Sequence, residues 1–240
     1  EVRLPDVEDF VKKNDVKEIT NPVFFVKTGI PTSDGLLSNE IFGITKEERA
    51  NIWGYINLRG NYLHPLIYKI WGKMDSSIKN IVYGLKGYVI DKDGYIVEDL
   101  ENGETGLDFL YKNIDRIKIR RTDAKSRDRN IEFIMKHKDR MFIKKMLVQP
   151  PYYRDVLNNK GKYYSSLLIF ARSLKETQDM GFSIGNSTKG RIQELLLSIY
   201  KCVTGTGTPE DGVGLSGKLG IIHGTALSKT VDYGTRLVMS

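Results

Sequence analysis

The chain alternates between stretches with apolar residues at helical spacing and shorter stretches typical of strands or loops. Residues 64–85 place their apolar side chains three and four positions apart, which predicts one or two helices. The same spacing predicts helices at 107–119, 130–137, 165–178 and 189–203. Residues 23–26 suit a strand, and residues 87–97 alternate around Asp93-Gly94 as in a β-hairpin. Residues 31–62 are punctuated by glycine and expected to be mostly loop. Together these patterns predict a mixed α+β fold.

The last two predicted helices favour an antiparallel helical hairpin, because only a short segment rich in Gly, Ser and Asn separates them. Its facing apolar residues are expected to be Leu167, Leu168, Phe170, Ala171 and Leu174 against Ile192, Leu195, Leu196, Ile199 and Val203. The connecting residues 180–188 carry no charge but include Met180, Phe182 and Ile184. Two interpretations are open: these three side chains form a partner surface, or they fold back against the hairpin.

Composition changes this picture mainly through charge. The 240 residues, 40% of them hydrophobic, suffice for one domain or two small ones, and no apolar run approaches the length of a membrane span. One cysteine excludes an internal disulfide and fits a reducing compartment. The net charge of +7 favours polyanionic partners. Residues 116–145 hold 12 Lys or Arg against 4 Asp or Glu, which is either a solvated helix face or a phosphate-contacting surface.

Residues 217–240 carry the most specific pattern. Gly217 and Gly220 free the backbone on either side of Lys218, and a short β-branched stretch follows. Read in order, GKLG followed by KTVDYGTR resembles the GKxG…KxVDYxxR stretch of the β′ subunit of bacterial multisubunit RNA polymerase. In that family the stretch forms the switch segment and the start of the catalytic double-psi barrel.

Other landmarks of the β′ family follow in the same order along the chain. Residues 34–37 (DGLL) and 40–43 (EIFG) resemble the DGLF…RIFG signature, and residues 54–58 (GYINL) with 64–68 (HPLIY) resemble the GHIEL…PVxHxWF block. Residues 77–91 and 106–115 resemble the helices and strand that come next, and residues 149–154 (QPPYYR) resemble the PPxLRP block before the lid. Each match is weak by itself, but together they span nearly the whole chain.

The resemblance implies a division of the chain. Residues 1–149 would form the clamp head and core, 150–164 a lid-like loop, 165–203 the clamp helical hairpin, 204–216 a rudder-like loop, and 217–240 the switch-like segment with the first barrel strand. It implies that the hairpin tip, with Met180, Phe182 and Ile184, docks a promoter-specificity factor. The nucleic-acid-binding residues that it implies are Arg154, Lys160 and Lys162 in the lid-like loop and Lys218, His223, Lys229 and Arg236 in the switch-like segment.

Three departures from the family are informative. The four-cysteine zinc ribbon is missing, since only residues 44–53 lie at its place and Cys202 falls in an apolar helical pattern. The magnesium-binding NADFDGD loop is not in this sequence, so the resemblance implies no catalytic residue or cofactor here and Mg²⁺ on another subunit. Arginines usual in the family are replaced by Ile221, His223 and Thr230, which implies a looser phosphate grip.

With these departures, the chain resembles part of the reduced, split polymerases of giant bacteriophages. The implied setting is the cytoplasm of an infected bacterial host, with β-like and β′ C-terminal-like chains, a specificity factor, template DNA and the RNA transcript as partners, and no membrane. Two other interpretations are a free-standing basic nucleic-acid-binding module and a P-loop nucleotide hydrolase. The latter rests on GxxxxGK at residues 212–218, where Leu219 replaces the Ser or Thr that would bind magnesium. His64, His137 and His223 lack metal-binding spacing.

Overall fold

The computed structural model describes residues 4, 6–120, 125–153, 159–204 and 206, and shows a mixed α+β fold. Its first half comprises α1 (Val7–Lys13), β1 (Lys17–Glu18), β2 (Phe25–Lys27), β3 (Ile30–Pro31), α2 (Asn39–Phe42), α3 (Glu48–Asn51), β4 (Gly54–Leu63), α4 (Pro65–Met74) and α5 (Ser77–Tyr83). The remainder comprises β5 (Tyr88–Ile90), β6 (Ile96–Glu98), α6 (Leu107–Asn113), α7 (Lys125–Lys136), β7 (Phe142–Val148), α8 (Asn159–Asp179) and α9 (Asn186–Thr204), with 3₁₀ turns at Lys138–Arg140 and Pro151–Tyr153.

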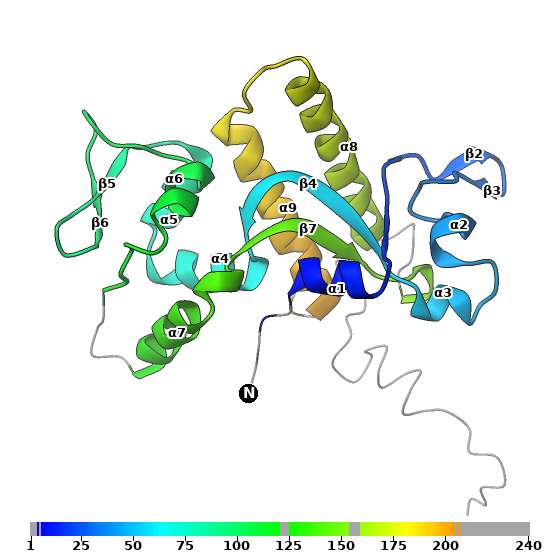
Figure 1. Cartoon of the computed structure of the whole chain (residues 1–240), viewed down its shortest axis with the longest axis horizontal. Helices are drawn as coiled ribbons and strands as arrows, with labels where there is room; N and C mark the ends of the chain where they lie inside the picture. Colours follow the sequence, from blue (N-terminus) through cyan, green and yellow to red (C-terminus); the bar gives the residue numbers. More distant parts are fainter. Residues whose placement is uncertain (1–3, 5, 121–124, 154–158, 205, 207–240) are drawn as a thin grey trace, which may run out of the picture.

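A three-stranded sheet with the order β1-β4-β7 forms the centre of the molecule. β1 pairs in parallel with the start of β4, and β7 pairs antiparallel along β4 on the other side. Figure 1 shows β4 and β7 as a curved arch, with α8 and α9 behind it and α1 in front. The β5–β6 hairpin with α5, α6 and α7 lies on the left of this view, and β2, β3, α2 and α3 lie on the right.

The longest strand, β4, occupies the region that the sequence predicts to be loop, so that prediction is wrong for residues 54–62. Along its first half, burial alternates as a half-buried strand requires, with Ile56 and Leu58 almost fully buried. Glycine at position 54 marks close packing and not a turn, because a Cβ there would lie 2.7 Å from the Ile19 Cδ1 atom. The pairing with β7 is irregular between Asn57 and Tyr62.

Other predicted elements form with shifted bounds. The helical region 64–85 is divided at Asp75, whose extended backbone ends α4 and whose carboxylate accepts the Ser77 N–H at 2.9 Å. The hairpin predicted around Asp93-Gly94 is confirmed as β5 and β6. The helix predicted at 107–119 ends at Asn113, because the following chain crosses to the hairpin turn, where the Lys118 N–H donates to the Gly94 carbonyl at 2.8 Å.

α8 and α9 pack against each other and run in opposite directions (Figure 1). α8 begins at Asn159, earlier than the predicted Ser165, because Tyr164 extends the apolar stripe of Leu167, Leu168 and Ala171 toward the amino terminus. Residues 159–164 are therefore helical, which corrects the prediction of a loop over 150–164 for that part. The predicted rudder-like loop, switch-like segment and barrel strand lie almost entirely outside the described residues.

Two glutamines attach this helix pair to the edge of β4 that β1 leaves uncovered. β1 pairs only with Gly54 and Tyr55. Further along, Gln193 of α9 donates to the Leu63 carbonyl at 2.8 Å and accepts the Leu63 N–H at 2.9 Å. Gln178 of α8 donates to the Arg59 carbonyl at 3.0 Å. Gln193 is fully buried, so its amide replaces a missing neighbouring strand inside the core.

His64 begins α4 as a buried cap. Its Nδ1 accepts the Leu66 N–H at 3.2 Å, and Pro65 occupies the first helical position. Burial, with a smaller effect of nearby His137, lowers the pKa of His64 to about 4. An imidazole that must be neutral to accept this hydrogen bond therefore stays neutral in the folded protein at physiological pH.

Replacing Gln193 with Leu should lower the free energy of unfolding by about 2–4 kcal/mol, because two buried backbone groups of Leu63 would lose their partners. Gln178→Leu is the matched control. It removes one bond at an exposed site and should cost less than about 1 kcal/mol. Urea unfolding followed by circular dichroism measures both. Equal losses would show that burial of the Gln193 amide is not what makes it important.

The His64 pKa predicts a pH dependence of stability. Above pH 6.5, the ordinary value, His64 is neutral in both states and costs nothing. As the pH falls toward 4, His64 binds a proton in the unfolded chain but stays neutral in the folded state. The free energy of unfolding therefore decreases, by about 2 kcal/mol at pH 5. His64→Asn keeps a capping oxygen but no titration and should flatten this part of the stability–pH curve. A variant curve parallel to that of the unmodified chain would contradict the assignment.

Candidate partner and nucleic-acid surfaces

The connection between α8 and α9 is a short, well-defined turn. The Phe182 N–H donates to the Thr177 carbonyl at 3.1 Å and the Gly181 N–H donates to the Gln178 carbonyl at 2.9 Å, which together form a Schellman helix end. Gly181 has the positive φ of 78° that this motif requires. Such an end usually buries its apolar residue against the last helical turn, yet 67% of Phe182 is exposed.

The three predicted partner residues of the tip do not share one environment. Met180 is 71% exposed, similar to Phe182, whereas Ile184 is half-buried and packs against the hydrophobic core. Each of the two interpretations of the tip therefore holds for some of its residues. Ile184 folds back, and Met180 and Phe182 present an apolar surface to solvent.

The amino-terminal end of α9 is held against the lobe formed by α5, α6 and the β5–β6 hairpin. Asn186 lies so close to Gly84 and Gly106, both with positive φ, that a Cβ on either would meet its side chain within 2.6 Å. The Lys189 ammonium forms a 2.6 Å ion pair with Asp108. One turn further, the Tyr68 hydroxyl donates to Glu194 at 2.6 Å. These contacts set the direction in which the tip projects.

Most of the predicted nucleic-acid-binding residues lie outside the part of the chain that the structure describes. Arg154, Lys218, His223, Lys229 and Arg236 lie outside the described residues, so the predicted switch-like site stays a prediction. Lys160 and Lys162 are on α8 rather than on a loop, and Lys162 is exposed.

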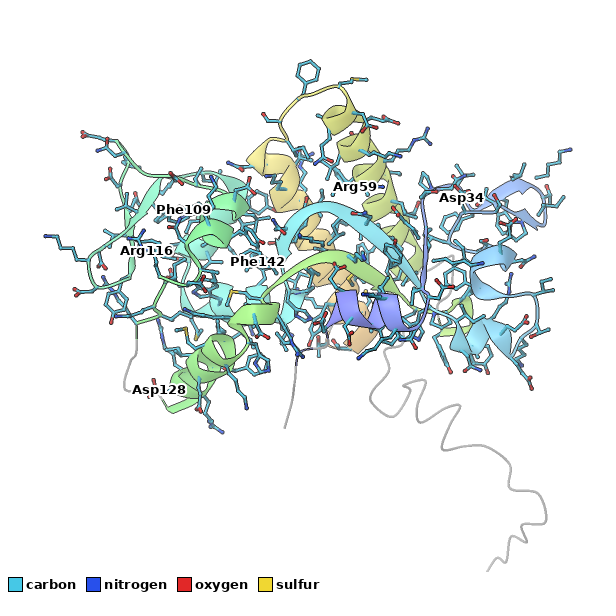
Figure 2. The ribbon with its side chains drawn as sticks, in the orientation of Figure 1. Asp34, Arg59, Phe109, Arg116, Asp128 and Phe142 are labelled. Atoms are coloured by element: carbon cyan, nitrogen blue, oxygen red, sulfur yellow. The ribbon has the colours of Figure 1, made fainter. Side chains whose placement is uncertain are left out.

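A groove of about 350 Å³ between α8 and the start of β4 has mixed charge, and several of its charged groups are paired or hydrogen-bonded to neighbouring residues. Arg59, at the irregular point of β4, forms a 3.0 Å ion pair with Glu18, and Arg172 pairs with Glu176 at 3.1 Å. Asp34 accepts a 2.6 Å hydrogen bond from the Thr20 hydroxyl, which lowers the pKa of its carboxyl group. Arg59 and Asp34 are labelled in Figure 2.

The stretch 116–145 is not one helix face. Residues 116–120 cross to the β5–β6 hairpin, α7 occupies the middle, and β7 holds Lys144 and Lys145. The sequence predicts a solvated helix face or a phosphate-contacting surface for this stretch, whereas the structure distributes its cations over several elements and places Lys118, Arg120 and Arg127 near Lys86 of another segment. Their clustering depends on a turn in the chain, which no periodicity reveals.

Neither metal sites nor membrane spans are found in the described ranges. No group of three or more His, Cys, Asp or Glu side chains among the described residues is placed to hold a metal ion. None of the helices described is both long and apolar enough to cross a membrane. Cys202 is buried, as its position in an apolar pattern predicts.

Comparison with known proteins adds no relative: no model of a protein family matches the chain, and no curated protein matches it. Any functional conclusion therefore depends on the residues and their geometry.

The exposure of the tip residues predicts a difference in stability. Met180→Ser with Phe182→Ser should change the free energy of unfolding by less than about 0.5 kcal/mol, since both side chains are largely in solvent. Ile184→Ser should lower it by about 1–2 kcal/mol, because it withdraws a half-buried side chain from the core. Thermal unfolding of the double variant, the Ile184 variant and the unmodified chain measures this difference. A large loss in the Met180/Phe182 variant would mean that these side chains support the fold.

Proposed function

We propose that the chain is a β′-like amino-terminal part of a DNA-directed RNA polymerase, in which it holds template DNA and the RNA–DNA hybrid. The observation that carries this proposal is the order of the β′ landmarks along the chain, from DGLL at residue 34 to VDY at residues 231–233. Unrelated sequences produce isolated matches of this quality, but a collinear series is much harder to produce by chance.

The positions of these landmarks in the fold support the proposal. GYINL forms the first half of the central strand β4, and HPLIY contains the cap and first turn of α4. The described part of the QPPYYR motif, residues 149–153, follows β7 directly, at the edge of the same sheet. These three motifs are therefore part of the framework around the central sheet, as expected for a subunit that acts as a scaffold.

In this proposal α8 and α9 act as the clamp helices. The tip with Met180 and Phe182 would receive the promoter-specificity factor, because an exposed aromatic and a flexible thioether are typical of interface anchors. The catalytic magnesium and its aspartates would be on another subunit, together with β-like and β′ C-terminal-like chains in the cytoplasm of an infected bacterium. The chain would be an enzyme component without catalytic residues.

The second candidate is a free-standing basic nucleic-acid-binding module, favoured by the cluster of cations in residues 116–145. The third, a P-loop hydrolase, depends on residues 212–218, which lie outside the described residues. Assembly separates the first candidate from the other two, since only a polymerase component requires large partner chains.

The test uses the chain co-expressed with the polymerase chains of the same genome. The proposal expects one stable complex that extends RNA on a preformed RNA–DNA scaffold, whereas the isolated chain makes no RNA. In that complex, Met180→Ser with Phe182→Ser should reduce promoter-dependent initiation about tenfold or more and leave scaffold extension intact.

Ile169→Ser is the matched control, because Ile169 is an exposed apolar residue on α8 away from the tip. It should affect neither assay. Failure of the chain to enter the complex would exclude the polymerase proposal. Equal loss of initiation and extension in the tip variant would exclude the docking role alone.

A further inference from the structure

A hollow of about 540 Å³ lies in the lobe on the left of Figure 1, between the α4–α5 junction, the β5–β6 hairpin, residues 118–120 and Arg127 of α7. Its charged lining residues are Asp75, Lys86, Glu98, Lys118, Arg120 and Arg127. The cations therefore come from three separate segments of the chain. The volume exceeds what one bound ion requires and is in the range of sites that hold several chemical groups.

Both acidic groups of this hollow already have partners. Asp75 accepts the Ser77 N–H at 2.9 Å and the Ser77 hydroxyl at 2.6 Å, so its carboxylate caps α5. Glu98 accepts both of its 2.9 Å bonds from Lys86. Lys118, Arg120 and Arg127 form no ion pair with the described residues. The hollow thus has three cations without an ion-pair partner among the described residues and one carboxylate, Asp75, that keeps its charge, so positive charge remains in excess.

The fold holds two of these cations at the hairpin. The Lys118 N–H donates to the Gly94 carbonyl, and the Arg120 guanidinium lies 5.1 Å from the centre of the Tyr95 ring. Gly94 permits this approach: it has a φ of 94°, and a Cβ there would lie 2.7 Å from the Arg116 carbonyl oxygen. The basic segment is therefore fixed against the turn and is not a freely solvated charge run.

Arg127 provides an independent indication of a ligand. Its Nε is buried and has no hydrogen-bond partner among the described residues, although its side chain lines the hollow. A buried guanidinium N–H without an acceptor is costly, and an anion bound in the hollow would supply that acceptor. Planar guanidinium groups bind phosphate oxygens especially well, because their N–H groups form a fork.

We infer that this hollow binds the phosphodiester backbone of a nucleic acid. Three unpaired cations from two separate segments, residues 118–120 and α7, match successive phosphates along a strand better than a single anion, and the binding they provide is independent of base sequence. The inference does not rest on the proposed function. A chain that never enters a polymerase complex could use the same hollow, and a polymerase component could lack this contact.

The test measures binding of fluorescent short DNA, as duplex and as single strand, to the full-length chain by anisotropy at increasing KCl. Lys118→Gln with Arg120→Gln removes two cations of the hollow. Arg129→Gln with Lys144→Gln is the matched control, because it removes two exposed cations of the same stretch that do not line the hollow. Melting temperatures of both variants verify folding.

Binding of either DNA form should weaken about tenfold or more at low salt in the Lys118/Arg120 variant, with the slope of log K against log salt reduced by about 2. The control should keep most of its affinity and slope. Equal losses in both variants would show that net charge alone drives binding, and absence of binding by the unmodified chain would also overturn the inference. The inference would also be overturned if tripolyphosphate or polyglutamate competed for binding as effectively as unlabelled DNA of equal total charge.

Discussion

The structure depends on how the edge of β4 that β1 leaves uncovered finds hydrogen-bond partners inside the core. β1 covers this edge only at Gly54 and Tyr55, and the strand continues for eight residues to Leu63. A buried strand edge cannot leave its N–H and C=O groups without partners. The amide of Gln193 carries the same donor and acceptor as a peptide group, so one side chain of α9 takes the role of a missing strand. No apolar residue at this position could do so, whatever its packing.

The direction of the helix pair follows from this attachment. With Gln193 held at Leu63 and Gln178 at Arg59, α8 and α9 pack against β4, and the turn between them projects away from the sheet (Figure 1). The same α9 is fixed to the neighbouring lobe by its ion pair with Asp108. The apolar tip and the cationic hollow thus belong to parts of the molecule that are connected through one helix, which gives them a defined relative position.

The two surfaces differ in their physical chemistry. At the tip, Met180 and Phe182 offer apolar area that the fold does not use, a property expected of a protein-binding surface. In the hollow, Arg120 and Arg127 form no ion pair with the described residues and leave positive charge in excess, a property expected of a phosphate-binding surface. The function proposed above, in which the chain holds nucleic acid and receives a protein factor, would use both kinds of surface.

The sequence by itself determined the elements whose signal is local. Helical spacing predicted α4, α5, α8 and α9, the Asp93-Gly94 pair predicted the β5–β6 turn, and the ordered motifs suggested a β′-like protein. The tertiary structure decided what depends on distant neighbours. Gly54 is in a strand because Ile19 packs against it, Ile184 is half-buried while Phe182 is exposed, and Lys118 meets the hairpin because Gly94 leaves room for the chain. Spacing along a chain reports which face a side chain takes, but only packing decides which segment that face will meet.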